Sequence, residues 1–320
     1  MAGARDEWGF RLTLIRHGET DQNRNKIIQG QENTVLNETG KEQVELVGNR
    51  FKYEHLTRIY SSDLERALKT AEGICLRNVH LKDLKICMDT SLRERNYGDA
   101  EGKSSPELKK MLSSGKLPHG AETEMQVQKR AVDFFTSLLR DVNHLKKSLR
   151  SKVEKNDTSL QRQHSEKPSK VDLTGDLRKP SHSDPSSDKS NHLKDALNSN
   201  LSSPDRKHRP TSLPLANNKK ILHPVLLKDL CHDINNPSDC DHTDRPIHVV
   251  VVSHGGILRH FVSYFAKNFQ VQFPVDKRKL LRQFCPNTGV SEFLVHLEGQ
   301  KVTNIDCLQL YDKSHLRHLS

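Results

Sequence analysis

Two basic side chains, Arg16 and His17, directly follow the hydrophobic run Leu12–Ile15. The run is typical of a buried strand, and open α/β sheets bind their ligands just beyond the carboxyl ends of such strands. Glycine and small polar residues come next, in the stretch LTLIRHGETDQN. Taken alone, so short a pattern is better explained as an ordinary strand end that carries two basic residues. The remaining polar clusters of the chain must decide.

Five further polar clusters fall after predicted strands or at predicted helix starts: SSDLERALKTA, LRERNYG, HGAETE, SHGG and PNTG. They place Arg66 on the first turn of a helix, Glu94 in a loop between two arginines, and His254 beside a helix N-terminus. The last cluster puts Asn287 and Thr288 before a strand. Each cluster alone also has an ordinary explanation, such as a surface ion pair or a turn. Their coincidence in this order points to a common site.

Such a site could transfer a phosphoryl group. The guanidinium groups of Arg16 and Arg66 match phosphate oxygens, and the helix N-termini after Gly18 and Gly255 favour the same anion. A neutral imidazole can attack phosphorus without a strong base. A carboxylic acid can protonate the departing alkoxide and then accept a proton from attacking water. Because this chemistry needs mainly positioning and charge neutralisation, we expect no metal and no other cofactor.

The ordered set LIRHGET, SSDLERALKTA, LRERNYG, SHGG and PNTG closely resembles the histidine phosphatase family, which includes cofactor-dependent phosphoglycerate mutases and fructose-2,6-bisphosphatases. The resemblance covers about residues 11–145 and 247–310. The stretches KIIQGQ, LNETG, RERNYGDAEGK and CPNTGVS are most similar to the fructose-2,6-bisphosphatase type, which regulates glycolysis. The resemblance implies a metal-independent phosphatase with a three-layer α/β/α sandwich and a mostly parallel central sheet.

The resemblance also assigns roles to individual positions. His17 corresponds to the histidine that becomes phosphorylated, Glu94 to the proton donor and acceptor, and His254 to the histidine that stabilises the transferring group. Arg16 and Arg66 correspond to the cationic clamp. Five substrate-binding positions follow in the same way: Thr20, Asn23, Gly30, Tyr97 and Gly255.

The chain departs from the family pattern in the stretch GAETE, where the family often has GGES. We expect Ala121 to narrow access to the backbone near Glu122, which leaves the role of Glu122 open.

Strands and helices are predicted to alternate along the chain. Strands are predicted at 11–15, 58–62, 84–89, 247–252, 290–297 and 301–310, and helices at 37–51, 63–76, 106–113, 124–145 and 257–266. Asp63 is the predicted N-cap of the second helix. This alternation predicts one α/β domain over residues 1–320, with a largely parallel sheet between two layers of helices.

Residues 146–246 interrupt this domain. They contain no Phe, Trp or Tyr but hold 9 of the 13 prolines. Such a composition buries too little apolar surface to offset the entropy of ordering, so we predict a low-complexity, largely disordered insertion. It is a candidate site for regulation or for protein partners. Its stretch 219–231 is apolar enough to dock as a short helix.

The formal charge of +10 raises the question of nucleic-acid binding. The insertion carries 19 Lys and Arg against 14 Asp and Glu, and the remainder carries 32 against 27, so both signs are mixed throughout. This mixture favours a solvated surface over a nucleic-acid interface.

Six cysteines form no CxxC pair, and Cys231, His232, Cys240 and His242 fit no standard zinc spacing, so no metal site is expected. The chain has no apolar N-terminal segment and no run of about 18 apolar residues, so neither a signal peptide nor a membrane span is predicted. We therefore expect a cytoplasmic protein, and the family resemblance also admits nuclear or mitochondrial association.

Three functions stay open at this point: a fructose-2,6-bisphosphatase, a 2,3-bisphosphoglycerate phosphatase or phosphoglycerate mutase, and a non-catalytic interaction scaffold. Mutases of this family usually carry a long basic cap after the glutamate loop. Only 19 residues lie between Gly98 and Pro118, among them Lys103, Lys109, Lys110 and Lys116. A short cap favours a wetter pocket and hydrolysis. The sequence does not identify the phosphate ester or the oligomeric state.

Overall fold

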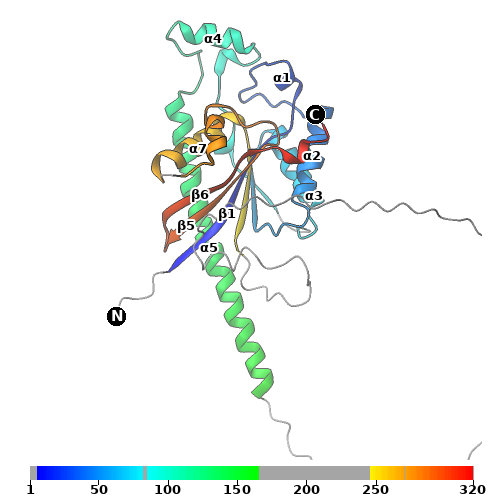
Figure 1. Ribbon diagram of the computed structural model, residues 1–320, viewed down its shortest axis with the longest axis vertical. Coiled ribbons are helices and arrows are strands. Elements are labelled where there is room, and N and C mark those ends of the chain that lie inside the picture. Colours follow the sequence, from blue (N-terminus) through cyan, green and yellow to red (C-terminus); the bar gives the residue numbers. More distant parts are fainter. Residues whose placement is uncertain (1–5, 82–84, 166–245, 270, 320) are drawn as a thin grey trace, which may run out of the picture.

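The computed structural model describes residues 6–81, 85–165, 246–269 and 271–319 (Figure 1). A six-stranded sheet forms its centre, in the order β3-β2-β4-β1-β5-β6. Its strands are β1 (Glu7–Arg16), β2 (Arg58–Ser61), β3 (Ile86–Met88), β4 (His248–Ser253), β5 (Val290–Glu298) and β6 (Lys301–Asp312). The strands β3, β2, β4 and β1 run parallel, whereas β5 and β6 form an antiparallel pair at one edge. The predicted mostly parallel sheet and the terminal strand pair are confirmed.

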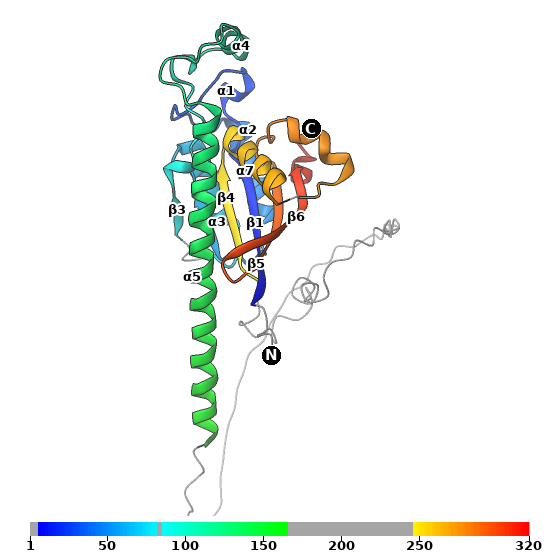
Figure 2. The ribbon, with the colours of Figure 1, turned by 90° about the vertical axis from the view of Figure 1, so that its left-hand side faces the viewer.

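Helices cover both faces of this sheet (Figure 2). The α-helices are α1 (Asp21–Arg24), α2 (Glu38–Arg50), α3 (Glu65–Arg77), α4 (Ser105–Ser113), α5 (Glu124–Ser165) and α7 (Gly255–Asn268). Short 3₁₀ turns are η1 (Thr90–Leu92), η2 (Gly98–Ala100), η3 (Val275–Arg282) and η4 (Ser314–Leu316). The core residues of α2 and α3 pack on one face of the sheet, and those of α5 and α7 pack on the other. The predicted three-layer sandwich is therefore confirmed.

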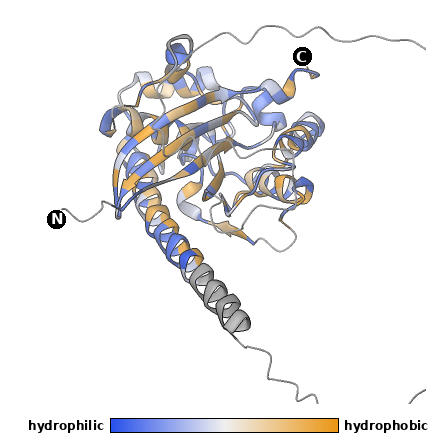
Figure 3. Cartoon of the chain, turned by 60° about the horizontal axis from the view of Figure 1, so that its bottom comes forward, coloured by the Kyte–Doolittle hydropathy of each residue, from blue (hydrophilic) through white to orange (hydrophobic). Residues whose placement is uncertain are grey.

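The valine run of β4 belongs to both layers of the core. Val249 and Val251 pack with the residues of α5 and α7, whereas Val250 and Val252 pack with those of α2 and α3. All four side chains are fully buried. A strand with helices on both faces needs apolar residues at every position, which explains the continuous run. Figure 3 shows hydrophobic residues concentrated in the strands of the sheet.

The helix α5 corrects one predicted boundary. It ends at Ser165 rather than near Leu145, so the first part of the predicted insertion is helical. The lysine and leucine residues that follow Leu145 are good helix formers. Lys146 also anchors the helix, because its ammonium lies 4.4 Å from the centroid of the Trp8 ring and 2.9 Å from the Asp6 carboxylate. The rest of the predicted insertion, with the stretch 219–231 and the weighed zinc ligands Cys231, His232, Cys240 and His242, lies outside the described residues.

The predicted N-cap at Asp63 is wrong. The helix α3 begins one residue later than such a cap requires, with Leu64 at the N-cap position and no side-chain cap. The Asp63 carboxylate instead accepts a hydrogen bond of 2.8 Å from Nε of Arg93. An ion pair with the neighbouring loop has replaced the cap.

Candidate active site

The carboxyl ends of three neighbouring strands place the two predicted histidines side by side. His17 follows β1 and His254 follows β4, and the backbone N–H of His17 donates to the carbonyl of Ser253 over 2.9 Å. Ser62 follows β2, and its N–H donates to the carbonyl of Val252. The ring centroids of His17 and His254 are consequently 5.1 Å apart. These positions are adjacent in space although they come from distant parts of the chain.

The His17 ring is fixed in one tautomer. Its Nδ1 lies 2.7 Å from the carbonyl oxygen of Gly18, and a carbonyl can only accept, so Nδ1 carries the ring proton. The lone pair is then on Nε2. Burial lowers the pKa of His17 well below its usual value, and the charges of Arg66 and Arg16 lower it further. At neutral pH the ring is therefore an uncharged base and nucleophile.

The His254 ring is held by Ser62. Its Nε2 lies 2.8 Å from Oγ of Ser62, which also accepts the N–H of Leu64 over 3.3 Å. We assign the Ser62 proton to the bond with Nε2, which places the ring proton of His254 on Nδ1. Burial, followed by the charge of Arg66, lowers the pKa of His254 well below its usual value. His254 is thus a second uncharged imidazole.

A third buried histidine, His248 at the start of β4, allows a prediction about stability. Burial, with a smaller effect from Arg11, lowers its pKa to about 3. Histidine in an unfolded chain becomes protonated at about pH 6.5, whereas folded His17, His254 and His248 stay uncharged there. The unfolded state then binds more protons as the pH falls, so the free energy of unfolding should decrease from pH 7.5 to 5.5. The midpoint of urea unfolding, measured across this pH range, reports the change in stability. A midpoint that rises towards pH 5.5 would contradict the prediction.

The two predicted arginines border the histidines and are held in different ways. Nη1 of Arg16 donates to the carbonyl of Cys285 over 2.8 Å. Arg66 is almost fully buried and donates to the carbonyls of Glu32 and Gly30 over 2.7 and 2.8 Å. Burial lowers the pKa of Arg66 to about 10, which leaves it charged at neutral pH. Arg66 thus supplies positive charge to the site and also fixes the loop 30–34.

Three buried nitrogen atoms of these residues have no hydrogen-bond partner among the described residues. They are Nε of Arg16, Nε of Arg66 and Nδ1 of His254. A buried donor without an acceptor costs about 1–3 kcal/mol, so this arrangement favours a ligand with several acceptor oxygens. The N-terminus of α7 adds partial positive charge beside Arg16. The site is therefore suited to bind a phosphate group.

Glu94 lies against the same helix N-terminus. Its Oε2 accepts the backbone N–H of Gly256 over 2.9 Å, and its Oε1 accepts the N–H of Arg95 over 2.8 Å. An added Cβ at Gly256 would lie 2.1 Å from Oε1 of Glu94, so a larger residue at this position would displace the carboxylate. The carboxylate, the two histidines and the two arginines thus belong to one site.

The substitution Gly256→Ala should therefore displace Glu94. Alanine is the better helix former, so this change by itself should not weaken α7. We expect kcat to fall by about 10²-fold, as for a catalytic group that moves by about 1 Å, while KM changes far less. Steady-state kinetics with any hydrolysed phosphate ester, together with thermal unfolding, measures both effects. Wild-type kcat in a folded Gly256→Ala protein would contradict this placement of Glu94.

Two of the predicted substrate-binding residues, Thr20 and Asn23, form the cap of the short helix α1. The side-chain hydroxyl of Thr20 accepts the N–H of Asn23, and Oδ1 of Asn23 accepts the N–H of Thr20. Nδ2 of Asn287 donates to Oδ1 of Asn23 and to the carbonyl of His17, over 3.1 and 3.0 Å. The sequence motif PNTG thus contributes a link between α1 and the backbone of His17.

The other three predicted substrate-binding residues shape the surroundings. Gly30 has a φ of +52°, and its carbonyl accepts from Arg66. Gly255 begins α7, where an added Cβ would lie 3.5 Å from Nε of Arg16. The guanidinium of Arg95 lies 5.2 Å from the centroid of the Tyr97 ring. Gly255 therefore adjoins Arg16, and Gly30 contacts Arg66.

Four residues that hold the predicted groups were not assigned from the sequence. They are Ser62, Gly256, Arg130 and Glu101, whose Oε1 accepts the backbone N–H of Tyr97 over 2.9 Å. Ser62 is next to the recognised arginine motif and Gly256 is the second glycine of SHGG, so both had a local signal. Arg130 lies on α5, and only the fold brings it to the Glu94 loop.

Within the described ranges, no group of three or more His, Cys, Asp or Glu residues could hold a metal ion. In this part of the chain, α5 is the longest helix and none of the helices meets the length and apolarity that a membrane span needs.

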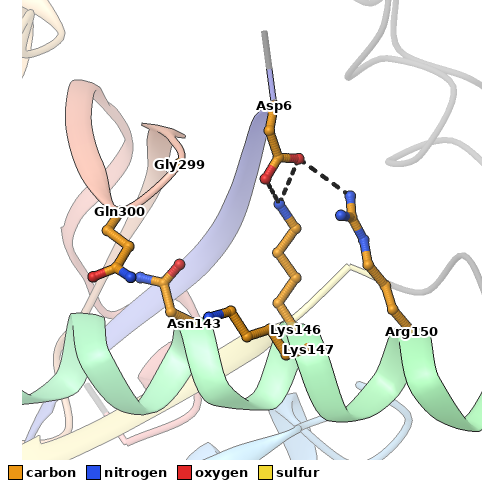
Figure 4. A pocket seen from close by; sticks show the side chains of 7 residues that line it. All are labelled: Asp6, Asn143, Lys146, Lys147, Arg150, Gly299 and Gln300. Carbon is orange, nitrogen blue, oxygen red and sulfur yellow. Dashed lines mark hydrogen bonds and ion pairs between the residues drawn. The ribbon is translucent and has the colours of Figure 1, made fainter. Parts of the chain in front are cut away.

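A hollow of about 210 Å³ lies near the amino end of β1, away from the histidines (Figure 4). Two of its three cations, Lys146 and Arg150, pair with Asp6, and it lies at the opposite end of β1 from His17, so we give this hollow no part in the reaction.

The fold and these residues define a class of enzyme. A sequence model of the Histidine phosphatase superfamily (branch 1) matches residues 12–145. The fructose-2,6-bisphosphatase TIGAR of Xenopus tropicalis is 30% identical over 97% of this chain and 96% of its own length. The chain belongs to the histidine phosphatase superfamily, and its activity is that of a phosphatase.

Further relatives agree with this assignment. The fructose-2,6-bisphosphatase TIGAR of Bos taurus is 30% identical over 94% of this chain and 95% of that protein. Among solved structures, the mycobacterial glucosyl-3-phosphoglycerate phosphatase superposes with a TM-score of 0.54 and 19% identity, over 96% of this chain and 100% of that chain. The structural likeness concerns the fold alone. The family predicted from the sequence motifs is confirmed, as is the similarity to the fructose-2,6-bisphosphatase type.

Proposed function

We propose that this phosphatase hydrolyses fructose 2,6-bisphosphate to fructose 6-phosphate and inorganic phosphate through a phosphohistidine at His17. The choice of substrate is supported by the names of the TIGAR relatives, which match nearly the whole chain. The mechanism rests above all on one observation. Nδ1 of His17 carries the ring proton and donates it to the carbonyl oxygen of Gly18, and burial lowers the pKa of the ring, so the lone pair on Nε2 is free.

The first step transfers the phosphoryl group to the enzyme. Nε2 of His17 attacks phosphorus, and the bond between phosphorus and the ester oxygen breaks. The departing alkoxide takes a proton from Glu94. Arg16, Arg66 and His254 bind the phosphoryl oxygens and neutralise their charge in the transition state.

The second step returns the enzyme to its starting state. A water molecule attacks phosphorus and gives a proton to the Glu94 carboxylate, while the bond between phosphorus and Nε2 breaks. Inorganic phosphate leaves, and Glu94 is again protonated for the next cycle. Atoms and charges balance without a metal ion or another reactant.

The cap beside the site favours water over a second acceptor. It contains one nine-residue helix, α4, none of whose residues is buried. A phosphoenzyme under such a cap is open to water, whereas a mutase must exclude it. This argument supports hydrolysis over transfer to a second sugar or glycerate.

A panel of phosphorylated metabolites tests the proposed substrate. Purified protein is assayed against fructose 2,6-bisphosphate, 2,3-bisphosphoglycerate, 3-phosphoglycerate and simple phosphate monoesters, with and without EDTA. We expect the largest kcat/KM for fructose 2,6-bisphosphate and no loss with EDTA. A larger kcat/KM for 2,3-bisphosphoglycerate would contradict fructose 2,6-bisphosphate as the substrate. Exchange of phosphate between glycerates would identify a mutase instead. Loss of the phosphatase activity in EDTA would contradict the metal-free mechanism.

A further inference from the structure

The Glu94 carboxylate lies on a loop with little regular structure of its own. The 3₁₀ turn η1 ends at Leu92 and η2 begins at Gly98, so residues 93–97 depend on contacts from elsewhere. A catalytic group loses much of its effect when it moves by about 1 Å. Some other part of the fold must therefore fix this loop.

Arg130, on the second turn of α5, makes these contacts. Its Nη1 donates to the carbonyls of Ser91 and Arg93 over 2.7 and 3.1 Å, and its Nη2 donates to the carbonyl of Glu94 over 3.3 Å. Nε and Nη2 each donate to one carboxylate oxygen of Glu122 over 2.7 Å. The five N–H donors of the guanidinium are all used, and three of them go to the backbone on the N-terminal side of the loop.

Glu122 holds the other side of the same loop. Its Oε2 accepts the N–H of Asn96 over 2.8 Å, and its backbone N–H donates to the carbonyl of Asn96 over 2.9 Å. Burial opposes the charge of Glu122, but the hydrogen bonds from Arg130 and Asn96 lower its pKa, so it is a carboxylate. The ion pair is mostly shielded from solvent, because the side chains of Arg130 and Glu122 are only 22% and 19% exposed.

We propose that Arg130 and Glu122 are a positioning pair that sets the place of the Glu94 carboxylate against the N-terminus of α7. Together they bind the backbone at Ser91, Arg93, Glu94 and Asn96, so the acid is held from both sides. No hydrogen bond joins the pair to His17 or to the unpartnered donors of the phosphate site among the described residues. The charge of Arg130 contributes to the lowered pKa of His254, and Arg130→Lys keeps that charge. This inference rests on the proposed role of Glu94 as the acid, and it gives a role to Glu122, which the sequence left open.

Lysine cannot replace Arg130 in this arrangement. Its ammonium has three donors and no planar fork, so it cannot bind three carbonyls and both oxygens of one carboxylate. The substitution Arg130→Lys keeps the charge, and Glu122→Gln removes the opposite one. The matched control is Lys129→Met, one residue earlier on α5, where Lys129 is 75% exposed and pairs with Asp133.

The test compares two phosphate esters, one with an alkyl leaving group and one with an activated aryl leaving group that needs no proton. For Arg130→Lys and Glu122→Gln we expect kcat to fall about 10- to 100-fold on the alkyl ester and less than about 3-fold on the aryl ester. Lys129→Met should match the wild type on both. Combining Arg130→Lys with Glu94→Gln should add little to the loss from Glu94→Gln alone, because both changes act on the same group.

Each outcome decides one part of the argument. Equal losses on both esters, or losses that multiply in the double variant, would overturn the positioning role of the pair. If Arg130→Lys does not fold, Glu122→Gln provides the same comparison. If Glu94→Gln slows both esters equally, the proposed acid role of Glu94 is wrong. Hydrogen exchange at the Gly256 amide, which donates to Glu94, then tests the positioning role of the pair independently of that acid role. Unchanged protection of that amide in Arg130→Lys would overturn it.

Discussion

His17→Ala should abolish phosphate release from every phosphate ester that the wild-type protein hydrolyses. The substitution removes Nε2, the atom that we propose attacks phosphorus, while Arg16, Arg66 and His254 can still bind the phosphate. Loss of the nucleophile removes the covalent route entirely, so we expect kcat to fall by at least about 10⁴-fold. Substrate affinity, measured by calorimetry with the inactive variant, should change far less.

The matched control is His248→Asn, which alters another buried histidine at the opposite end of β4. Its side chain binds Thr13 rather than any group of the site, so it should cost stability but leave kcat near that of the wild type. A loss in His17→Ala much smaller than about 10⁴-fold would contradict the covalent route, because phosphorus would then be attacked without His17. A scaffold function without catalysis would instead predict no turnover by the wild-type protein.

The second large effect is expected for Glu94→Gln. Glutamine keeps the size of the side chain but has no proton to give to a departing alkoxide. General acid catalysis usually contributes about 10²–10⁴-fold, and we expect a loss in this range for fructose 2,6-bisphosphate. An aryl ester whose leaving group is stable as an anion should lose far less, since His17 can still attack it.

Glu107→Gln provides the control for this comparison. Glu107 is an exposed carboxylate on the cap helix α4 and has no contact with the site. Its substitution should leave the ratio of the two rates unchanged. If Glu94→Gln slows both esters equally, Glu94 does not act as the acid, and its contact with Gly256 has only a structural purpose.

Much of this site could be predicted because its main residues follow hydrophobic strands. Arg16 and His17 come directly after β1, and His254 comes directly after the valines of β4. Parallel strands end at the same edge of a sheet, so these residues had to meet once the strands were placed. Glu94 was harder to place by pattern alone, and family motifs rather than periodicity identified it.

The features that were missed depend on contacts between distant residues. Asp63 has the side chain of an N-cap, but Arg93, 30 positions later, binds its carboxylate. Lys146, in the extended part of α5, has partners near the N-terminus, and Asp6 lies 140 positions before it. Arg130 likewise has a surface-like local pattern and gains its role only when α5 packs beside the Glu94 loop. Local propensity cannot contain such information.

The central claim is a covalent phosphoryl group on His17, and direct labelling tests it. Wild-type protein is mixed for milliseconds with fructose 2,6-bisphosphate labelled at the 2-phosphate, quenched in base and digested, and the labelled peptide is sequenced. We predict a base-stable, acid-labile label on His17, absent from His17→Ala and longer-lived in Glu94→Gln. A label on another residue, or rapid turnover by wild-type protein that never carries one, would contradict the account.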